Sequence, residues 1–240
     1  MAETEYDVII IGAGAVAENV ADRVVQGGLT AVLIESELVG GECSYWACMP
    51  SKALLRSGIA LRAAQNVGGA KQAITGGLDV AAVLERRNSF TSNWDDSGQV
   101  DWVRGAGIDL VRGHGRITGE KKVSVELDGE ITELTARHAV VVSTGSDPVL
   151  PDIPGLADVN PWTPREATSA RVIPESLAII GGGVVAVEMA TAYASFGCAV
   201  TIMARSGLLG GQEDFAGEIV GEALKELGVS IARRTERRQP

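Results

Sequence analysis

Residues 6–36 place a run of β-branched residues, a glycine turn, a helical segment and a second apolar run in direct succession. The turn has the pattern G-x-G-x-x-A, formed by Gly12, Gly14 and Ala17. In this context the first glycine makes the tight turn, the second lets the backbone approach a pyrophosphate, and the small third residue lets helix and strand pack closely. Glu35 ends the second apolar run, where a carboxylate accepts hydrogen bonds from a ribose. The stretch therefore predicts a strand–helix–strand unit that binds a dinucleotide.

The same pattern recurs at a constant offset in residues 177–206. The position of Glu35 is taken there by Ala204, and Arg205 and Ser206 follow directly. A carboxylate would repel a 2′-phosphate, whereas an arginine binds one, so this copy is predicted to prefer NADP over NAD. Its candidate nucleotide-binding residues are Gly181, Gly183, Val185, Ala186, Arg205 and Ser206.

Two cysteines, Cys43 and Cys48, lie between the two copies and directly after the first one. No C-x-x-C or H-x-x-x-H spacing occurs, so we expect no metal site. On a straight helix, residues five apart are about 7.5 Å apart along the axis, so a disulfide needs a turn or a distorted helix start. Gly40, Gly41 and Pro50 are compatible with such an irregularity. The pattern favours a redox pair over a structural bridge, with Cys48 near a helix N-terminus and Lys52 close by.

The charge balance limits the partners that this chain can have. The formal net charge is −10, which argues against nucleic acid, because phosphate binding needs clustered basic residues. No apolar run approaches the length of about 20 residues that spans a bilayer, so no membrane segment is expected. The cysteine usage and the acidic N-terminal residues predict a reducing, cytoplasmic location.

Local patterns predict the remaining secondary structure. Residues 51–66 and 80–104 each have a helical pattern, and a hairpin is expected to turn at Asp128 and Gly129. Residues 138–144 have the composition of a buried strand. A proline-rich stretch then predicts a domain boundary near residue 150.

The chain resembles the pyridine nucleotide–disulfide oxidoreductases, of the dihydrolipoamide dehydrogenase and mercuric reductase type. The resemblance lies in "GGEC....CMPSKALL", in the first glycine pattern with Glu35, in "VVVSTGSDPVLPDIPG", and in "GGGVVAVE". It implies an α/β fold of two Rossmann-like three-layer units, the second incomplete. Residues 1–150 would form an FAD-binding domain with the cysteine pair, and residues 151–240 an incomplete NAD(P)-binding domain.

The resemblance also implies roles for individual residues. Cys48 would be the thiol facing the flavin and Cys43 the thiol that attacks the substrate. Lys52 would lie near the flavin ring and pair with Glu188. Hydride would pass from NAD(P)H through FAD to the cysteine disulfide, or in reverse, and the substrate would be a small disulfide, a dithiol or a related electron acceptor. The FAD contacts would be Gly12, Gly14, Ala17, Glu35, Gly41, Glu42, Lys52, Gly115, Thr144 and Gly145.

Two departures from the family pattern leave alternatives open. Tyr45 and Trp46 stand between the cysteines, where the family has smaller residues, and they either narrow access to Cys43 or pack in the core. The family's interface domain, which forms a homodimer and supplies an acid–base pair, has no counterpart here, so we expect a C-terminally truncated member with weak FAD affinity and low turnover. The competing hypotheses are a non-catalytic nucleotide-binding remnant, and an NAD(P)H oxidase or diaphorase that does not use the cysteines.

Overall fold

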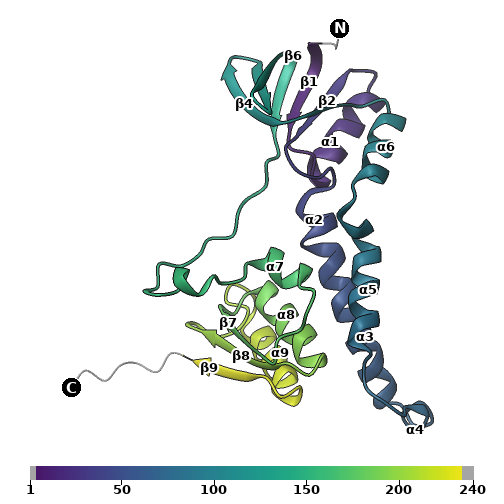
Figure 1. Cartoon of the computed structure of the whole chain (residues 1–240), viewed down its shortest axis with the longest axis vertical. Helices are drawn as coiled ribbons and strands as arrows, with labels where there is room; N and C mark the ends of the chain where they lie inside the picture. Colours follow the sequence, from purple (N-terminus) through teal and green to yellow (C-terminus); the bar gives the residue numbers. More distant parts are fainter. Residues whose placement is uncertain (1–3, 234–240) are drawn as a thin grey trace. The chain divides into compact units, whose positions relative to one another are not determined.

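The computed structural model describes residues 4–233 of the chain (Figure 1). The chain forms two compact units, and each unit is built from two separate segments of the sequence. The first unit consists of Met1–Met49 and Thr91–Pro151, and the second of Pro50–Phe90 and Asp152–Pro240. No helix in the described part of the chain is long and apolar enough to cross a membrane.

The first unit contains a six-stranded mixed sheet in the order β3-β2-β1-β6-β5-β4. Strand β1 lies parallel to β2 and β6, β2 lies parallel to β3, and β4, β5 and β6 form an antiparallel meander. The strands are β1 (Glu5–Ile11), β2 (Ala31–Glu35), β3 (Asp109–Arg112), β4 (His114–Gly119), β5 (Lys122–Leu127) and β6 (Glu130–Val142).

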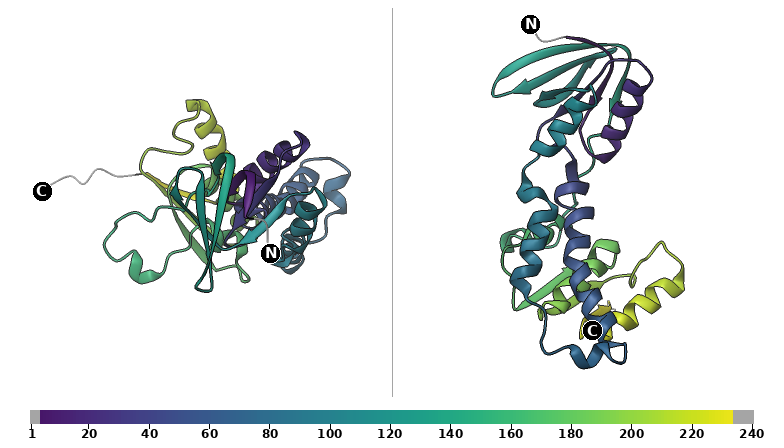
Figure 2. Two further views of the ribbon diagram at one scale, coloured as in Figure 1. Left: turned by 90° about the horizontal axis from the view of Figure 1, so that it is seen from above. Right: turned by 90° about the vertical axis from the view of Figure 1, so that its right-hand side faces the viewer.

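Each face of the parallel strands is covered by its own apolar core. On one face, β1 and β2 pack against helices α1 and α6 through a cluster that includes Ile10, Leu33 and Val103. On the other face, the sheet curls so that the antiparallel strands fold over the parallel ones, around Ile9, Ile34 and other apolar residues (Figure 2). The helical elements of this unit are α1 (Ala15–Gln26), α2 (Gly41–Tyr45), the 3₁₀ turn η1 (Ser92–Trp94) and α6 (Ser97–Gly105).

The second unit is built on a three-stranded parallel sheet in the order β7-β8-β9. Its core joins Leu54 of α3 and Val83 of α5 to residues of α8, β8 and α9. The predicted fold class, α/β with two Rossmann-like units, is confirmed. The elements are α3 (Cys48–Gln65, which begins in the first unit), α4 (Ala70–Ala73), α5 (Val80–Phe90), η2 (Ala157–Val159), α7 (Pro164–Ser169), β7 (Ser176–Ile180), α8 (Val184–Ser195), β8 (Ala199–Ala204), α9 (Asp214–Glu226) and β9 (Ser230–Arg233).

Two of the predicted elements are confirmed. Helix α3 covers nearly all of residues 51–66, although it begins earlier, at Cys48. The hairpin between β5 and β6 turns at Asp128 and Gly129, whose φ angles of 51° and 85° are the positive values that a type I′ turn requires.

Two other predictions are wrong. Residues 80–104 do not form one helix, because α5 ends at Phe90 and the chain passes through Ser92, Asn93 and Trp94, all with positive φ, before α6 begins. The strand over residues 138–144 is not buried, and the Val142 side chain is 59% exposed. The reason is that β5 pairs with β6 only as far as Thr135, so beyond it β6 has only β1 as a described neighbour. The division into nucleotide domains at residue 150 stays a prediction, and the helices of residues 50–90 belong to the second compact unit.

A fully buried arginine of the second unit forms hydrogen bonds with the C-terminal end of α7. Arg87 of α5 donates hydrogen bonds to the backbone oxygens of Thr168 and Ala170, the latter at 2.9 Å. Tyr193 of α8 donates to the Ala167 oxygen at 2.7 Å. A helix ends with unsatisfied carbonyl groups that carry partial negative charge, and the guanidinium neutralises them here.

Replacing this arginine should destabilise the second unit. Arg87→Ala leaves buried carbonyls without their donors and opens a cavity, so we expect the free energy of unfolding to fall by about 3 kcal/mol. Urea denaturation followed by circular dichroism measures this change. The matched control is Arg86→Ala, which loses one hydrogen bond to Ala53 and a contact with the Phe90 ring, and should cost about 1 kcal/mol. Equal losses for the two variants would contradict the assigned role.

Candidate redox and nucleotide sites

The first glycine turn depends on a backbone contact that only glycine permits. Gly12 follows β1 with a φ of 99°, and its N–H donates to the Ile34 oxygen at 2.8 Å. A Cβ at this position would lie 2.3 Å from the backbone oxygen of Ser143 and 3.3 Å from the Cα of Thr144. Gly12 is therefore needed so that the segment after β6 can approach the end of β1.

The second glycine leaves the N-terminus of α1 accessible. Gly14 is the N-cap, and no side chain caps this end of the helix. A Cβ on Gly14 would meet only the Gly41 Cα, at 3.9 Å, whereas a Cβ on Gly41 would lie 2.8 Å from the Gly14 Cα. The Gly40 N–H also donates to the Ala13 oxygen at 2.8 Å. The first turns of α1 and α2 therefore meet backbone to backbone, next to helix N–H groups that can bind an anion.

Glu35 is held in place at the end of β2. Its two carboxylate oxygens accept hydrogen bonds from the backbone N–H of Ala13 at 2.8 Å and of Glu37 at 2.7 Å. Each oxygen keeps a further lone pair, which leaves acceptor capacity for ribose hydroxyl groups. The sequence prediction for Glu35 is thus compatible with its position beside the glycine turn.

The other predicted FAD contacts of this unit lie on α1, α2, β4 and the segment after β6. Ala17 is buried behind the glycine turn, and Glu42 stands in the first turn of α2. Gly115 has a packing reason to be glycine, since a Cβ would lie 3.0 Å from Ile11 and 3.1 Å from Ile34 side-chain atoms. Gly145 has a φ of 71° in open surroundings. The structure gathers Gly12, Gly14, Gly41 and Thr144 around the ends of β1 and β6.

A break between two helices brings the cysteines together. Cys43 lies in α2, which ends at Tyr45, and Cys48 is the first residue of α3. Between them the Ala47 N–H donates to the Glu42 oxygen at 2.6 Å, a wider turn than that of an α-helix. The distorted helix start that a redox pair requires is therefore present. Both thiols are free in this structure, and Cys48 is the more exposed of the two.

The environment of Cys43 disfavours its ionised form. Burial of the thiol is the main cause, followed by the side-chain hydrogen bond with Cys48, and together they raise the pKa of Cys43 to about 11. Cys48 is the first residue of α3 and is exposed to solvent. The two thiols are thus chemically unequal although they are in contact.

Tyr45 is part of the core, as the packing alternative predicts. Its side chain is 2% exposed, and burial raises the pKa of the hydroxyl to about 12. The indole N–H of Trp94 donates to its backbone oxygen at 3.1 Å. Trp46 is only half-buried and meets the Tyr45 ring edge-on, with 5.8 Å between ring centroids.

The second unit contains the predicted ion pair between Lys52 and Glu188. The Lys52 Nζ and the Glu188 Oε1 are 2.5 Å apart, and the lysine side chain is 63% exposed. The pair joins α3 to α8, two residues beyond the last residue of the second glycine pattern, Ala186. Its part in the chemistry stays a prediction.

The second glycine pattern repeats the open helix N-terminus. Gly183 is the uncapped N-cap of α8, and a Cβ on Gly181 or Gly183 would meet no atom within 4 Å. Val185 is exposed and Ala186 half-buried in the first turn of the helix. Sequence reasoning missed Gly182, whose Cβ would lie 2.2 Å from the backbone oxygen of Gly207. The run of three glycines at 181–183, together with Gly207 after the next strand, could have indicated a close backbone approach between these two segments.

Arg205 and Ser206 follow the end of β8, and both are exposed. They directly precede Gly207, which touches Gly182 of the glycine turn. The predicted nucleotide-selecting residues therefore lie in the loop beside the open end of α8. Ala204, at the position of Glu35, is buried and offers no carboxylate.

The family model described as pyridine nucleotide-disulphide oxidoreductase matches residues 6–239. The chain belongs to this family. Among its relatives are mercuric reductases from Staphylococcus aureus, 31% identical over 95% of this chain and 41% of that protein, and from Acidithiobacillus ferrooxidans, 32% identical over 98% and 44%. A dihydrolipoyl dehydrogenase from Acholeplasma laidlawii is 30% identical over 97% of this chain and 69% of that protein.

A solved structure agrees with the family assignment at the level of the fold. The Cu(II) complex of the HOCl-induced flavoprotein disulfide reductase RclA from Escherichia coli matches with a TM-score of 0.80 and 23% identity. The match covers 98% of this chain and 50% of that one. The chain spans less than half the length of the mercuric reductases named above.

The third cysteine of this family member stands apart from the pair. Cys198 is 6% exposed and lies in the core of the second unit, where burial raises its pKa. This agrees with a structural thiol. Within residues 4–233, no three His, Cys, Asp or Glu residues gather in a way that could hold a metal ion.

The inequality of the two paired thiols predicts selective alkylation. With a pKa of about 11, Cys43 has a thiolate fraction of about one in a thousand at pH 8. We expect iodoacetamide to modify the exposed Cys48 at least about tenfold faster than Cys43, and the rate at Cys43 to rise up to about pH 11. Mass spectrometry of the tryptic peptides measures both rates, with buried Cys198 as an internal control. Equal rates at Cys43 and Cys48 would contradict the described environments.

Proposed function

We propose that this chain carries the nucleotide sites and the redox centre of an FAD-dependent NAD(P)H:disulfide oxidoreductase. The observation that carries the proposal is the contact between the Cys43 and Cys48 thiols at the break between α2 and α3. Helix α2 begins at Gly41, which lies against Gly14 of the first glycine turn. The overall reaction is NAD(P)H + H⁺ + RSSR → NAD(P)⁺ + 2 RSH, and it is balanced in atoms and electrons. The reverse direction would oxidise a dithiol.

The residues of the first unit fit the pyrophosphate and ribose of FAD. The uncapped N-terminus of α1 offers backbone N–H groups, Gly14 leaves room above them, and Glu35 presents free lone pairs. Bound FAD would supply a two-electron relay between the nicotinamide and the cysteine pair. The open N-terminus of α8 fits the second dinucleotide in the same way. We accordingly assign FAD to residues 1–150 and the nicotinamide nucleotide to residues 151–240.

The cysteines divide the disulfide chemistry between them. In the reduced pair, the Cys43 sulfur attacks one sulfur of the substrate, an enzyme–substrate disulfide forms, and the first RS⁻ leaves and takes up a proton. The Cys48 thiolate then attacks the Cys43 sulfur, which releases the second thiol and closes the Cys43–Cys48 disulfide. Two electrons from NAD(P)H return the pair to the dithiol.

The substrate class follows from two adjacent thiols. Such a pair exchanges with small disulfides and dithiols, and thiolates also bind soft metal ions. Because relatives at 30–32% identity are named mercuric reductases, Hg(II) is our second candidate, reduced as NADPH + Hg(II) → NADP⁺ + H⁺ + Hg(0). We further propose that the complete protein works as a homodimer, as the family resemblance implies.

Arg205 should select NADPH at the second site. A charge-assisted hydrogen bond to the 2′-phosphate is worth about 2 kcal/mol, so Arg205→Ala is expected to weaken NADPH binding by tenfold or more. The dissociation constant of NADH should change less than about twofold. Isothermal titration calorimetry measures both constants, and Arg171→Ala, another exposed arginine of this unit, is the control. Equal losses for NADPH and NADH would exclude a role in the choice between them.

The proposed function is tested by an anaerobic visible spectrum of the chain reconstituted with FAD and titrated with NADPH. We expect a retained flavin and a long-wavelength thiolate-to-flavin band that Cys48→Ser abolishes. Gly14→Ala should fold, because its φ is −77° and its Cβ has room, yet it should lose FAD by closing the pyrophosphate approach. Gly98→Ala, an open helical position, should retain FAD.

The same preparation separates the alternatives. Electron transfer to a quinone that survives Cys48→Ser, without any disulfide or Hg(II) reduction in the wild-type chain, would identify a diaphorase. A wild-type chain that binds neither FAD nor NADPH would be a remnant, and the proposal would be wrong. Lipoamide, glutathione disulfide and Hg(II) in parallel assays identify the substrate class.

A further inference from the structure

The loop between β2 and α2 supplies one of the two N–H groups that hold the Glu35 carboxylate. This donor is the N–H of Glu37, at 2.7 Å from the Glu35 Oε1, although Glu37 itself is exposed. Arg112, the last residue of β3, donates from its Nη1 to the Glu37 backbone oxygen at 2.9 Å. The main chain of Glu37 therefore connects the arginine to the carboxylate.

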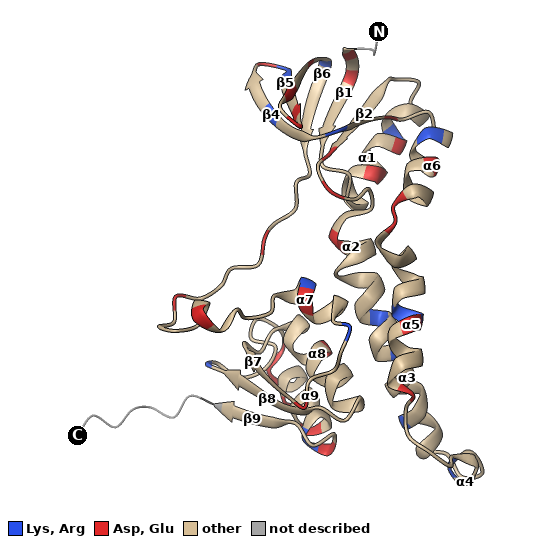
Figure 3. Cartoon of the chain, viewed as in Figure 1, with Lys and Arg blue, Asp and Glu red and all other residues tan. Residues whose placement is uncertain are grey.

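A second contact fixes the same loop two residues further along. Asp96, the N-cap residue of α6, accepts a hydrogen bond from the Val39 N–H at 2.8 Å on its Oδ2. The same oxygen lies 2.5 Å from the Nη2 of Arg112. Acidic residues lie on the turn that leads into α6 (Figure 3). The Arg112–Asp96 ion pair thus binds the loop at two main-chain positions, Glu37 and Val39.

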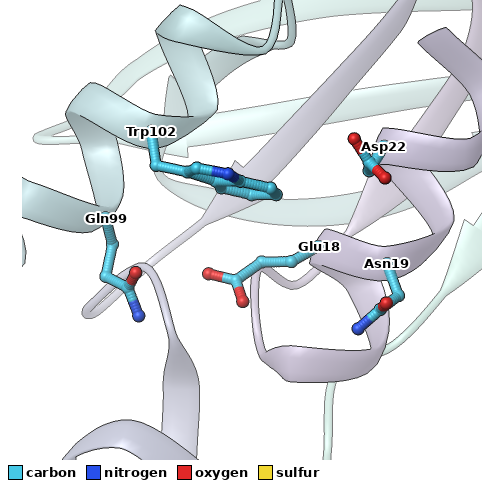
Figure 4. A pocket seen from close by; sticks show the side chains of 5 residues that line it. All are labelled: Glu18, Asn19, Asp22, Gln99 and Trp102. Carbon is cyan, nitrogen blue, oxygen red and sulfur yellow. The ribbon is translucent and has the colours of Figure 1, made fainter. Parts of the chain in front are cut away.

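This ion pair is partly shielded from water. The side chain of Arg112 is 33% exposed and that of Asp96 is 15% exposed, and within residues 4–233 Asp96 is the one carboxylate that forms an ion pair with Arg112. Glu18 of α1 points instead into a pocket beside Trp102 of α6 (Figure 4). A pair held by several hydrogen bonds keeps its geometry better than an isolated exposed pair, so it can hold a loop in place.

The backbone of Glu35 does not depend on the Arg112 side chain. Glu35 and Arg112 are register partners in the parallel strands β2 and β3, and the Gly113 N–H donates to the Glu35 backbone oxygen at 2.9 Å. The Ala13 N–H, at 2.8 Å from the Glu35 Oε2, belongs to the glycine turn. Loss of the Arg112 side chain should therefore leave the sheet intact and release only the loop and the N–H that it contributes.

We propose that Arg112, together with Asp96, is a positioning residue for Glu35, and that it thereby sets the affinity of the first site for the adenosine ribose of FAD. The statement about FAD rests on the proposed function, whereas the statement about the Glu35 carboxylate does not. A side chain that is already fixed loses less rotational freedom when it binds a ligand. The ion pair keeps this cost low, because it holds the donor that fixes the carboxylate.

The first measurement is amide hydrogen exchange by NMR on the chain without FAD. Arg112→Ala should accelerate exchange at the Glu37 N–H by about tenfold, because the loop loses an anchor and opens more often. Exchange at the Gly113 N–H should change by less than about twofold, because that group is bonded within the sheet. The matched control is Arg116→Ala, an exposed arginine of β4, which should change neither rate.

The second measurement is calorimetric binding of FAD and of an FAD analogue whose adenosine ribose lacks the 2′-hydroxyl. A carboxylate at the end of the second strand binds this hydroxyl, so Arg112→Ala should weaken FAD about fivefold and the 2′-deoxy analogue less than about 1.5-fold. A merely structural defect would weaken both ligands equally. Arg112→Lys keeps the charge but not the planar fork of donors, so its affinity for FAD should lie between the other two.

Three results would overturn the proposal: unchanged exchange at Glu37 in Arg112→Ala, an equal acceleration at Gly113, or an equal loss of affinity for FAD and its 2′-deoxy analogue. If Arg112→Ala does not fold by circular dichroism, Arg112→Lys replaces it, with smaller changes of the same sign expected. A wild-type chain that binds no FAD would remove the statement about FAD together with the proposed function. The exchange rates would still decide whether Arg112 positions Glu35.

Discussion

The structure of the first unit depends on backbone contacts that leave no room for a side chain. The carbonyl of Ser143 would lie 2.3 Å from a Cβ on Gly12, and the Cα of Gly14 would lie 2.8 Å from one on Gly41. These two contacts bring the ends of β1 and β6 and the starts of α1 and α2 to one place. The first glycine turn and helix α2, which contains Cys43, are therefore held together by these backbone contacts.

Helix α2 is too short to be stable alone. The position at which it ends determines the surroundings of the two cysteines. By ending at Tyr45, it allows Cys43 to remain partly buried while Cys48 opens the next helix in contact with water. The buried Tyr45 anchors this break to the core, and Trp94 holds its backbone. The difference in burial between two neighbouring sulfurs thus follows from a local irregularity of the backbone, and it gives each cysteine a separate chemical character.

Both glycine turns, the helix break at the cysteine pair and the Asp128–Gly129 turn could be predicted because each depends on residues that are consecutive in the sequence. The Lys52–Glu188 pair was predictable only through the family resemblance, because 136 residues separate the two partners. The break after Phe90 was missed because three non-glycine residues adopt positive φ there, against their intrinsic preference. Gly182 and Arg87 were missed because their partners are backbone atoms that only the folded chain brings near.

The Arg87 contacts bear on the order in which the chain becomes protected during synthesis. The Arg87 guanidinium binds the carbonyl groups of Thr168 and Ala170, which lie 81 and 83 positions later in the sequence. These contacts can form only after that later segment has been synthesised. Until the ribosome has released α7 and α8, helices α3 and α5 display the apolar side chains of Leu54 and Val83 without a cover. The growing polypeptide therefore passes through a long interval in which its second unit is a target for chaperones and proteases, while the strands and glycine turn of residues 5–35 have already emerged.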